Sequence, residues 1–150
     1  MEIEIRQAAA SDTAAIRELT RAAYLKWVPI TGREPAPMTA DYDAAVRNHR
    51  FDLLLVAGTL AALIELVDER DQLLIENLAV APAWQGHGFG SRLMALAEDV
   101  ARDLGRPRLR LFTNKLWSAN IRLYQRLGYR IDGETPIDCG MFRVDMSKDL

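Results

Sequence analysis

Residues 82–93, PAWQGHGFGSRL, place glycines at the alternating positions Gly86, Gly88 and Gly90. An apolar run over 73–80 precedes this segment, and a helical pattern follows it. Glycines this close together indicate that the backbone turns sharply or that another group approaches it. A strand that leads through such a turn into a helix directs backbone N–H groups and the positive end of the helix dipole at one point. The segment therefore predicts an anion-binding site, with a tight turn that binds nothing as the alternative.

The composition is that of one globular domain over residues 1–150, with 49% hydrophobic and 27% charged residues. Nineteen Lys and Arg against 21 Asp and Glu give a net charge of −2, without the basic excess typical of nucleic-acid binding. Cys139 is the single cysteine, so no internal disulfide is expected and a reducing compartment is indicated. Residues 1–12 lack the pattern of a signal peptide, and no apolar run reaches the length of a membrane span. We expect a cytoplasmic protein with neither nucleic acid nor membrane as partner.

Apolar periodicity and turn residues predict the order β-α-α-β-β-β-α-β-α-β-β. The expected strands are 3–8, 52–58, 60–68, 73–80, 108–113, 129–132 and 140–146. The expected helices are one after Ser11, one around 39–49 after Thr39, then 90–104 and 118–127, the last capped by Ser118. Gly58-Thr59 marks a hairpin turn. This order predicts a single α/β domain: a mixed, mostly antiparallel sheet with helices on both faces.

Two common phosphate-binding motifs do not fit the glycine segment. A P-loop requires a lysine after its last glycine, and none follows here. A dinucleotide fingerprint counted from Gly86 would need glycine or alanine where Ser91 stands. The acidic residue expected at the end of the next strand is also absent, because Thr113 and Asn114 stand there.

Two segments resemble signatures of the GCN5-related N-acetyltransferases, the GNAT superfamily. Gln85-x-x-Gly88-x-Gly90, preceded by NLAVAP, is similar to the acetyl-CoA loop of that family. TNKLWSANIRLYQRLGY, with Asn120 and Tyr124, looks like its second signature. The predicted element order also resembles the family's fold over nearly the whole chain.

The resemblance implies acetyl-CoA as cosubstrate and no metal. The loop amides from Gly86 through Ser91 would hold the CoA pyrophosphate. In the family, the strand before the loop splays from its parallel neighbour, and the pantetheine arm pairs with the backbone groups in the gap. The implied cofactor-binding residues are Leu78, Ala79, Val80, Gln85, Gly86, His87, Gly88, Phe89, Gly90, Ser91, Asn120 and Tyr124.

The implied reaction is direct attack by a primary amine on the acetyl thioester in a ternary complex. Tyr124 matches the family's general acid, and a phenol is a hydrogen-bond donor at neutral pH. A backbone N–H near Leu78 would stabilise the oxyanion. Asn120, one helical turn before the tyrosine, would bind pantetheine or orient the phenol. The alternatives are that the tyrosine packs in the core and that the asparagine is solvated.

Glu76 is the candidate general base, because several family members carry a base on this strand. It interrupts an apolar run, and strand alternation predicts that it shares a face with Leu74, Leu78 and Val80. Apolar surroundings raise the pKa of a carboxyl toward the range of a useful base. A structural salt bridge and a solvent-facing side chain are the alternatives. Glu65 on the neighbouring strand is the second candidate.

Three further reactive side chains are given minor roles. His87 is interpreted as a variable position near the phosphates and His49 as a surface residue. Cys139 could accept the acetyl group first, but its sequence neighbours supply no activating base, so it is interpreted as an ordinary strand-end residue. No group of His, Cys and Asp has metal-ligand spacing.

The acceptor amine is not identified by the sequence. In the family, segments equivalent to 28–42 and 130–140 select it, and Arg33 in the first could bind a substrate carboxylate or be solvated. We expect an N-acetyltransferase for a small-molecule or peptide amine. A non-catalytic acyl-CoA sensor on the same fold and a binder of another phosphate ligand are the alternatives. Homodimers are common in the family.

Overall fold

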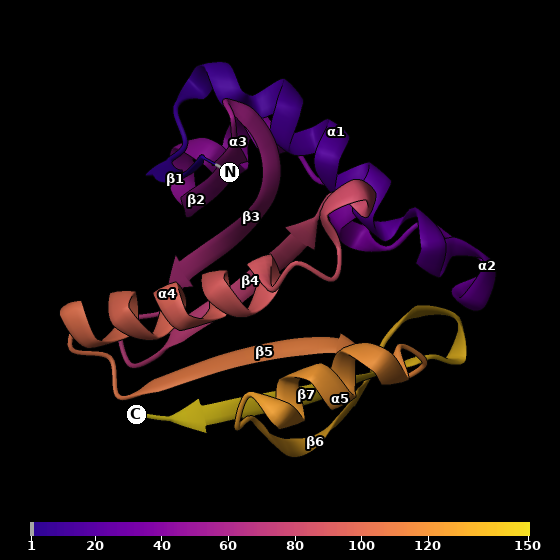
Figure 1. Ribbon diagram of the computed structural model, residues 1–150. Coiled ribbons are helices and arrows are strands. Elements are labelled where there is room, and N and C mark those ends of the chain that lie inside the picture. Colours follow the sequence, from indigo (N-terminus) through magenta and orange to yellow (C-terminus); the bar gives the residue numbers. More distant parts are fainter. Residues whose placement is uncertain (1) are drawn as a thin grey trace.

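The computed structural model describes residues 2–150 as a seven-stranded sheet in the order β1-β2-β3-β4-β5-β7-β6 (Figure 1). The strands are β1 Ile3–Gln7, β2 Arg50–Val56, β3 Thr59–Asp68, β4 Leu73–Val80, β5 Arg108–Asn114, β6 Arg130–Pro136 and β7 Phe142–Asp149. The helices are α1 Thr13–Tyr24, α2 Val28–Thr31, α3 Tyr42–Asn48, α4 Phe89–Asp103 and α5 Ser118–Arg126. β4 and β5 are parallel, and the other neighbouring strands are antiparallel. The predicted α/β fold and its element order are confirmed, with the short α2 added.

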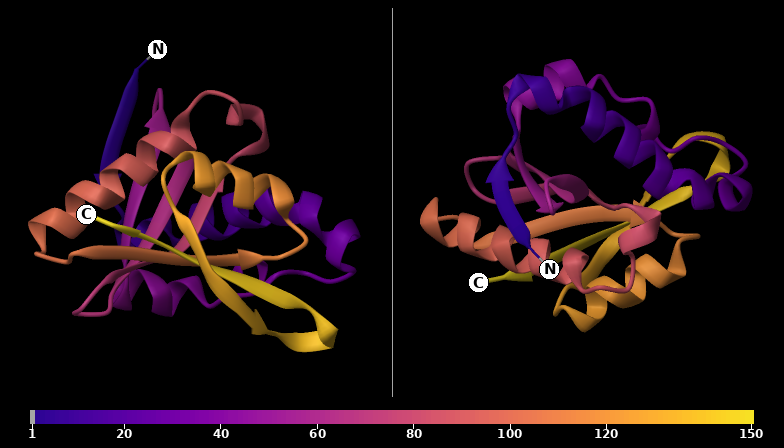
Figure 2. Two further views of the ribbon diagram at one scale, coloured as in Figure 1. Left: turned by 90° about the horizontal axis from the view of Figure 1, so that it is seen from below. Right: turned by 45° about the horizontal axis from the view of Figure 1, so that its top comes forward.

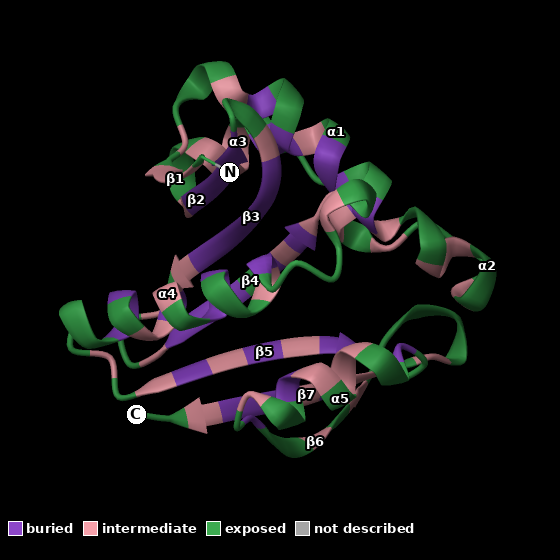
Figure 3. Cartoon of the chain, viewed as in Figure 1, coloured by how far each residue is buried: buried purple, intermediate pink, exposed green. Residues whose placement is uncertain are grey.

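Helices cover both faces of the sheet, and each face has its own apolar cluster (Figure 2). On one face, Leu93 of α4 and Tyr124 of α5 pack in a cluster with the sheet. On the other face, Ile16 and Leu19 of α1 and Tyr42 of α3 pack in the second cluster. The interior strand β3 is buried along most of its length (Figure 3) because its side chains belong to both clusters. None of the helices within residues 2–150 is long and apolar enough to cross a membrane.

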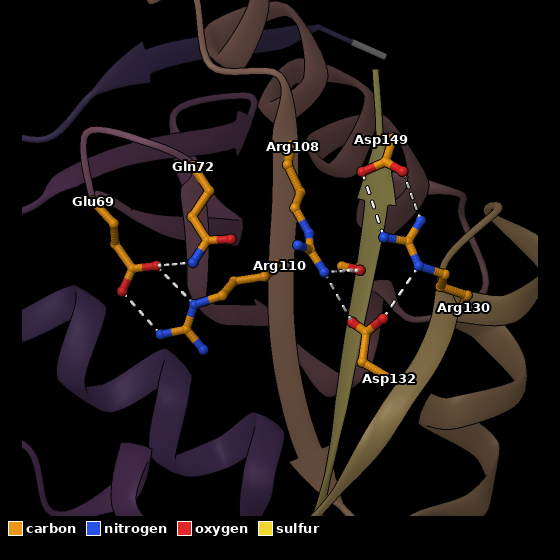
Figure 4. Close-up of polar contacts among 8 residues, drawn as sticks. Glu69, Gln72, Arg108, Arg110, Arg130, Asp132 and Asp149 are labelled. Carbon is orange, nitrogen blue, oxygen red and sulfur yellow. Dashed lines mark hydrogen bonds and ion pairs between the residues drawn. The ribbon is translucent and has the colours of Figure 1, made fainter.

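The parallel pair β4 and β5 separates along its length. Its register contains two residue pairs, Leu73 with Leu109 and Leu74 with Arg110, and the strands then diverge (Figure 1). The closed end is reinforced by Arg110, whose guanidinium forms hydrogen bonds of 2.7 and 2.9 Å with the Glu69 carboxylate (Figure 4). The open end, toward the C-termini of both strands, lies next to the glycine segment and the start of α5.

A β-bulge in β4 changes which side chains share a face. Glu65 of β3 is opposite Asn77, but the next residue of β3 is opposite Ile75, so Glu76 is an extra residue in its strand. Leu78 and Val80 therefore pack in the α4 cluster, while Glu76 lines a cavity on the other side of the sheet. The prediction that Glu76 shares a face with Leu78 and Val80 is wrong, because strict alternation ends at the bulge.

Several predicted element ends are corrected by local hydrogen bonding. α3 starts after Asp41, whose carboxylate accepts a hydrogen bond from the Ala44 amide, rather than after Thr39. Trp117, not Ser118, is the N-cap residue of α5. The first hairpin turns at Ala57-Gly58, both with positive φ, one residue before the predicted position. A polar residue near the start of a helix therefore predicts that a helix is present more reliably than it predicts the residue at which the helix begins.

Candidate active site

The glycine segment needs glycine at two of its three positions. Gly86 and Gly88 have φ of 82° and 79°, a left-handed conformation that other residues adopt at a cost. A Cβ at either position would meet nothing within 4 Å, so this side of the backbone is open to a ligand. Gly90 lies inside α4, and a Cβ there would touch Val80 Cγ2 at 3.8 Å, an ordinary contact.

The start of α4 presents backbone donors on this open side. Gly88 is the N-cap residue, and the amide of Arg92 is 3.1 Å from the Gly88 carbonyl oxygen. The amides of the preceding helical residues, 89–91, have no intrahelical acceptor, as in the first turn of any α-helix. Helix α4 has 15 residues and directs the positive end of its dipole to the same place. This geometry fits a diphosphate group.

A groove of about 400 Å³ runs from the glycine segment to the gap between β4 and α5. It is lined by the predicted cofactor-binding residues other than His87, namely Leu78, Ala79, Val80, Gln85, Gly86, Gly88, Phe89, Gly90, Ser91, Asn120 and Tyr124. Lys26 and Arg126 also line it and add two cationic groups. His87 is exposed outside the groove, with its Nδ1 3.2 Å from the carbonyl oxygens of Trp84 and Gln85.

A second cavity, of about 450 Å³, occupies the opening between the diverging strands. We call it the acceptor cavity, after the role proposed for it below. Its walls come from β4, β5, the segment 31–39, the start of α5 and the tip of the β6–β7 hairpin. The groove and the acceptor cavity share four lining residues, Tyr24, Leu78, Asn120 and Tyr124. These residues mark the place where a ligand in the groove would meet one in the acceptor cavity.

Tyr124 is suited to donate a proton at this junction. It is 8% exposed, and its ring lies edge-on to Tyr129 with 6.2 Å between the centroids. Burial raises the pKa of Tyr124 to about 12, so the phenol stays protonated at neutral pH. The expected alternative of core packing also holds, since the ring belongs to the α4 cluster while the residue lines both cavities.

Tyr24, at the end of α1, is a site residue that the sequence did not indicate. Its hydroxyl donates a hydrogen bond of 2.8 Å to Asn77 Oδ1, and burial raises the pKa of its phenol well above the ordinary value. The ring lies near Trp117, which in turn stacks on Trp27 with centroids 5.2 Å apart. The signal available in the sequence was the pair of aromatic residues Tyr24 and Trp27 at the end of the first helix, but helical periodicity alone does not distinguish such residues from core residues.

Glu76 lines the acceptor cavity from the bulge of β4. Its side chain keeps contact with solvent, but the surrounding protein displaces part of its water and raises the pKa of the carboxyl above the ordinary value. Glu65 points elsewhere, because its Oε2 lies 2.7 Å from His49 Nδ1. His49 is thus half-buried and paired rather than a free surface residue.

The two segments expected to select the acceptor meet at the mouth of this cavity. Arg33 lies 2.8 Å from Cys139 Sγ and 3.8 Å from the Asp138 carboxylate, so the α2 region is joined to the hairpin tip. Arg33 and Asp138 both line the cavity. No group of three or more His, Cys, Asp or Glu within residues 2–150 is arranged to hold a metal ion.

Comparison with known proteins assigns the family. The model of the acetyltransferase (GNAT) family matches residues 13–129. The chain belongs to this family. The two GNAT signatures described above lie within the matched residues, and the family prediction is confirmed.

Individual known proteins are also similar to this chain. Mouse N-alpha-acetyltransferase 80 is 38% identical over 71 residues, which are 47% of this chain and 21% of the mouse protein. The chain therefore spans about a fifth of that relative's length. Salmonella typhimurium yncA, solved with its cofactor acetyl-CoA, has a TM-score of 0.78 and 23% identity, covering 100% of this chain and 95% of its own. The Escherichia coli ribosomal-protein-S18-alanine N-acetyltransferase has a TM-score of 0.77 and 20% identity, covering 99% and 94%.

Proposed function

We propose that this protein transfers the acetyl group of acetyl-CoA to a primary amine by direct attack in a ternary complex. The observation that carries the proposal is the junction at Leu78 and Tyr124, where the groove beside the glycine segment meets the acceptor cavity. A ternary complex requires two sites that meet at one point. Family membership and the acetyl-CoA bound to yncA support the same donor here.

Acetyl-CoA would lie in the groove and supply an activated thioester carbonyl. The amides of residues 89–91 and of the turn at Gly86 and Gly88 would bind its pyrophosphate, with Lys26 and Arg126 adding positive charge. The backbone of Leu78 through Val80 would pair with the pantetheine arm. These strand groups are available because β5 leaves β4 after Leu74.

Three groups of this chain would lower the barrier. Glu76 would take the proton from the acceptor ammonium, which makes the amine nucleophilic, and its raised pKa favours that role at neutral pH. The amide of Leu78 would donate to the oxygen that becomes negatively charged. The phenol of Tyr124 would give its proton to the departing thiolate sulfur, so that CoA leaves as the thiol, and would regain a proton from the nitrogen of the tetrahedral intermediate as the amide forms.

The acceptor is proposed only as a primary amine of a small molecule or of a peptide. Mouse N-alpha-acetyltransferase 80 and the Escherichia coli enzyme for ribosomal protein S18 favour testing a peptide α-amine alongside small amines. A non-catalytic acyl-CoA sensor is the competing function. The presence of a protonated Tyr124 and of Glu76 on the walls of one cavity favours the enzyme, because a sensor needs neither group.

Isothermal titration of acetyl-CoA, CoA and ATP into the protein tests the donor. We expect micromolar binding of acetyl-CoA and CoA with no heat from ATP. A thiol-release assay with small amines and N-terminal peptides then tests the transfer. Failure of both CoA species to bind would refute the donor, whereas tight binding without thiol release from any amine would favour the sensor.

A further inference from the structure

A third cavity lies behind Glu76, on the α3 side of the sheet, with a volume of about 310 Å³. We call it the rear cavity. It shares five lining residues with the acceptor cavity: Ala36, Pro37, Glu76, Asn77 and Phe112. The bulge of β4 thus places the carboxylate of Glu76 on the wall between two adjoining cavities. Apolar groups make up most of its lining, but polar side chains including Asp41, His49, Glu65 and Asn77 also face it, and its volume has room for several water molecules.

The outer wall of the rear cavity carries a histidine held by a buried carboxylate. His49 Nδ1 and Glu65 Oε2 are 2.7 Å apart, and both residues line the cavity. The Glu65 residue is 4% exposed, whereas the side chain of His49 is 32% exposed. Glu65 lies on β3 opposite Asn77, directly beside the bulge. The imidazole therefore faces both the rear cavity and solvent.

The side chain of Glu65 holds the imidazole of His49 through its Nδ1 atom. A neutral imidazole that faces a carboxylate through Nδ1 carries its proton there and leaves Nε2 as the basic atom. Histidine is also the side chain that exchanges protons most readily near neutral pH. A buried carboxylate that orients a histidine in this way is used in acid–base catalysis, and here the histidine lines the same cavity as the candidate base Glu76.

We propose that His49, held by Glu65, carries the proton of the acceptor amine from Glu76 to solvent. This inference rests on the proposed function. The acceptor ammonium gives its proton to the Glu76 carboxylate and becomes a neutral amine. The carboxyl then loses that proton through water in the rear cavity to Nε2 of the imidazole, and the imidazolium releases it to bulk. Each cycle returns both side chains to their starting forms and adds one proton to the solvent.

The other charged groups near Glu76 are already engaged in ion pairs or in a helix cap, so the imidazole of His49 is the group left to carry a proton in this cavity. Apart from His49, the charged groups that influence the pKa of the Glu76 carboxyl are Arg110 of β5, Arg143 of β7 and Glu69 of the β3–β4 turn. Both arginines are in ion pairs, with Glu69 and Asp145. The third acid of the rear cavity, Asp41, caps α3 through the Ala44 amide. No lysine or arginine is among the residues that line the rear cavity within residues 2–150.

The competing explanation is that the pair only joins the end of α3 to β3. His49 is the C-cap residue of that helix, so an ion pair there would stabilise the fold without moving protons. The two roles differ in one respect. A proton carrier can be replaced by a small base in solution, whereas a structural contact cannot.

The test compares His49→Gln with Asn48→Ala, a matched control from an exposed residue on the same cavity wall. Turnover is measured by thiol release from pH 6 to 9 with increasing imidazole in the buffer. We expect His49→Gln to lose about 10²-fold in kcat, the lower end of acid–base effects, and to regain rate as imidazole is added. We expect Asn48→Ala to match the wild type. Wild-type turnover in His49→Gln, or a loss that imidazole does not restore, would overturn the proposal.

A second measurement tests the pair without turnover, so its failure is separate from failure of the acetyltransferase function. The chain has two histidines, His49 and His87, whose ring nitrogens are resolved by proton–nitrogen correlation spectra. We expect neutral His49 to carry its proton on Nδ1, and Glu65→Gln to move the signals of His49 alone. A neutral ring protonated on Nε2, or one insensitive to Glu65→Gln, would refute the relay even if the wild type acetylates amines.

Discussion

Replacing Tyr124 with phenylalanine separates catalysis from folding and from donor binding. The change removes one hydroxyl and keeps the ring that packs against Tyr129 at 6.2 Å. No group of residues 2–150 forms a hydrogen bond with the Tyr124 hydroxyl, so its loss leaves no buried partner unsatisfied. We expect the free energy of unfolding to change by less than about 0.5 kcal/mol.

The expected loss of rate follows from the general-acid role proposed for the phenol. General acid catalysis contributes roughly 10²–10⁴-fold. At about 1.36 kcal/mol for each factor of ten, Tyr124→Phe raises the barrier by about 2.7–5.4 kcal/mol. The affinity for acetyl-CoA stays within about a factor of two, because the groove keeps its shape and its backbone donors.

The pH dependence gives an internal check. Burial raises the pKa of Tyr124 to about 12, so the phenol remains protonated and able to donate through the whole assay range. The wild-type rate therefore shows no decline caused by Tyr124 below about pH 10. A decline between pH 8 and 9 that disappears in Tyr124→Phe would contradict this assignment of its protonation.

Tyr129→Phe is the matched control. Tyr129 is equally buried, its hydroxyl has no hydrogen-bond partner within residues 2–150, and it lines neither the groove nor the acceptor cavity. The control should keep the wild-type turnover. Thiol release measures kcat, and calorimetric titration measures the affinity for acetyl-CoA. Undiminished acetylation by Tyr124→Phe, or an equal loss in Tyr129→Phe, would refute the general-acid role.

Three further predictions follow from the same geometry. Gly88→Ala should lower the free energy of unfolding, measured in urea, by about 1–2 kcal/mol because residue 88 has a positive φ. Gly90→Ala, inside α4, should be neutral or raise that free energy by up to about 1 kcal/mol. Equal effects of the two substitutions would contradict the backbone conformations described here. Glu76→Gln should abolish the acidic limb of kcat/KM, which its raised pKa places above that of an ordinary carboxyl, and a limb that persists would identify another base. A hydrogen bond from Arg6 lowers the pKa of Asp12 to about 2, so the stability this carboxylate adds is present above about pH 4 and is lost toward pH 2; Asp12→Asn melts should differ from wild type at pH 7 and converge at pH 2.

Local sequence determined the part of the site proposed to bind the acetyl donor. The strand predicted over 73–80 agrees with β4, and the helix predicted from residue 90 begins at Phe89. The turn requires a positive φ at residues 86 and 88, which favours glycine there, so the sequence itself shows this local requirement. For the same reason, the residues expected to bind the cofactor line one groove, with His87 as the exception.

The part of the site proposed to bind the acceptor depended on tertiary structure. The bulge at Glu76 arises from the pairing of β4 with β3, and the contact of His49 with Glu65 joins the end of a helix to a strand. The spacing of apolar residues along the chain predicts neither feature. Tyr24 reaches Asn77 across 53 positions of the chain, and Arg33 reaches Cys139 across 106. Sequence specifies directly what short stretches of backbone must do. The twist of the sheet and the separation of its strands decide where side chains from distant segments meet. That geometry depends on the packing of all the strands together, so no short stretch of sequence specifies it.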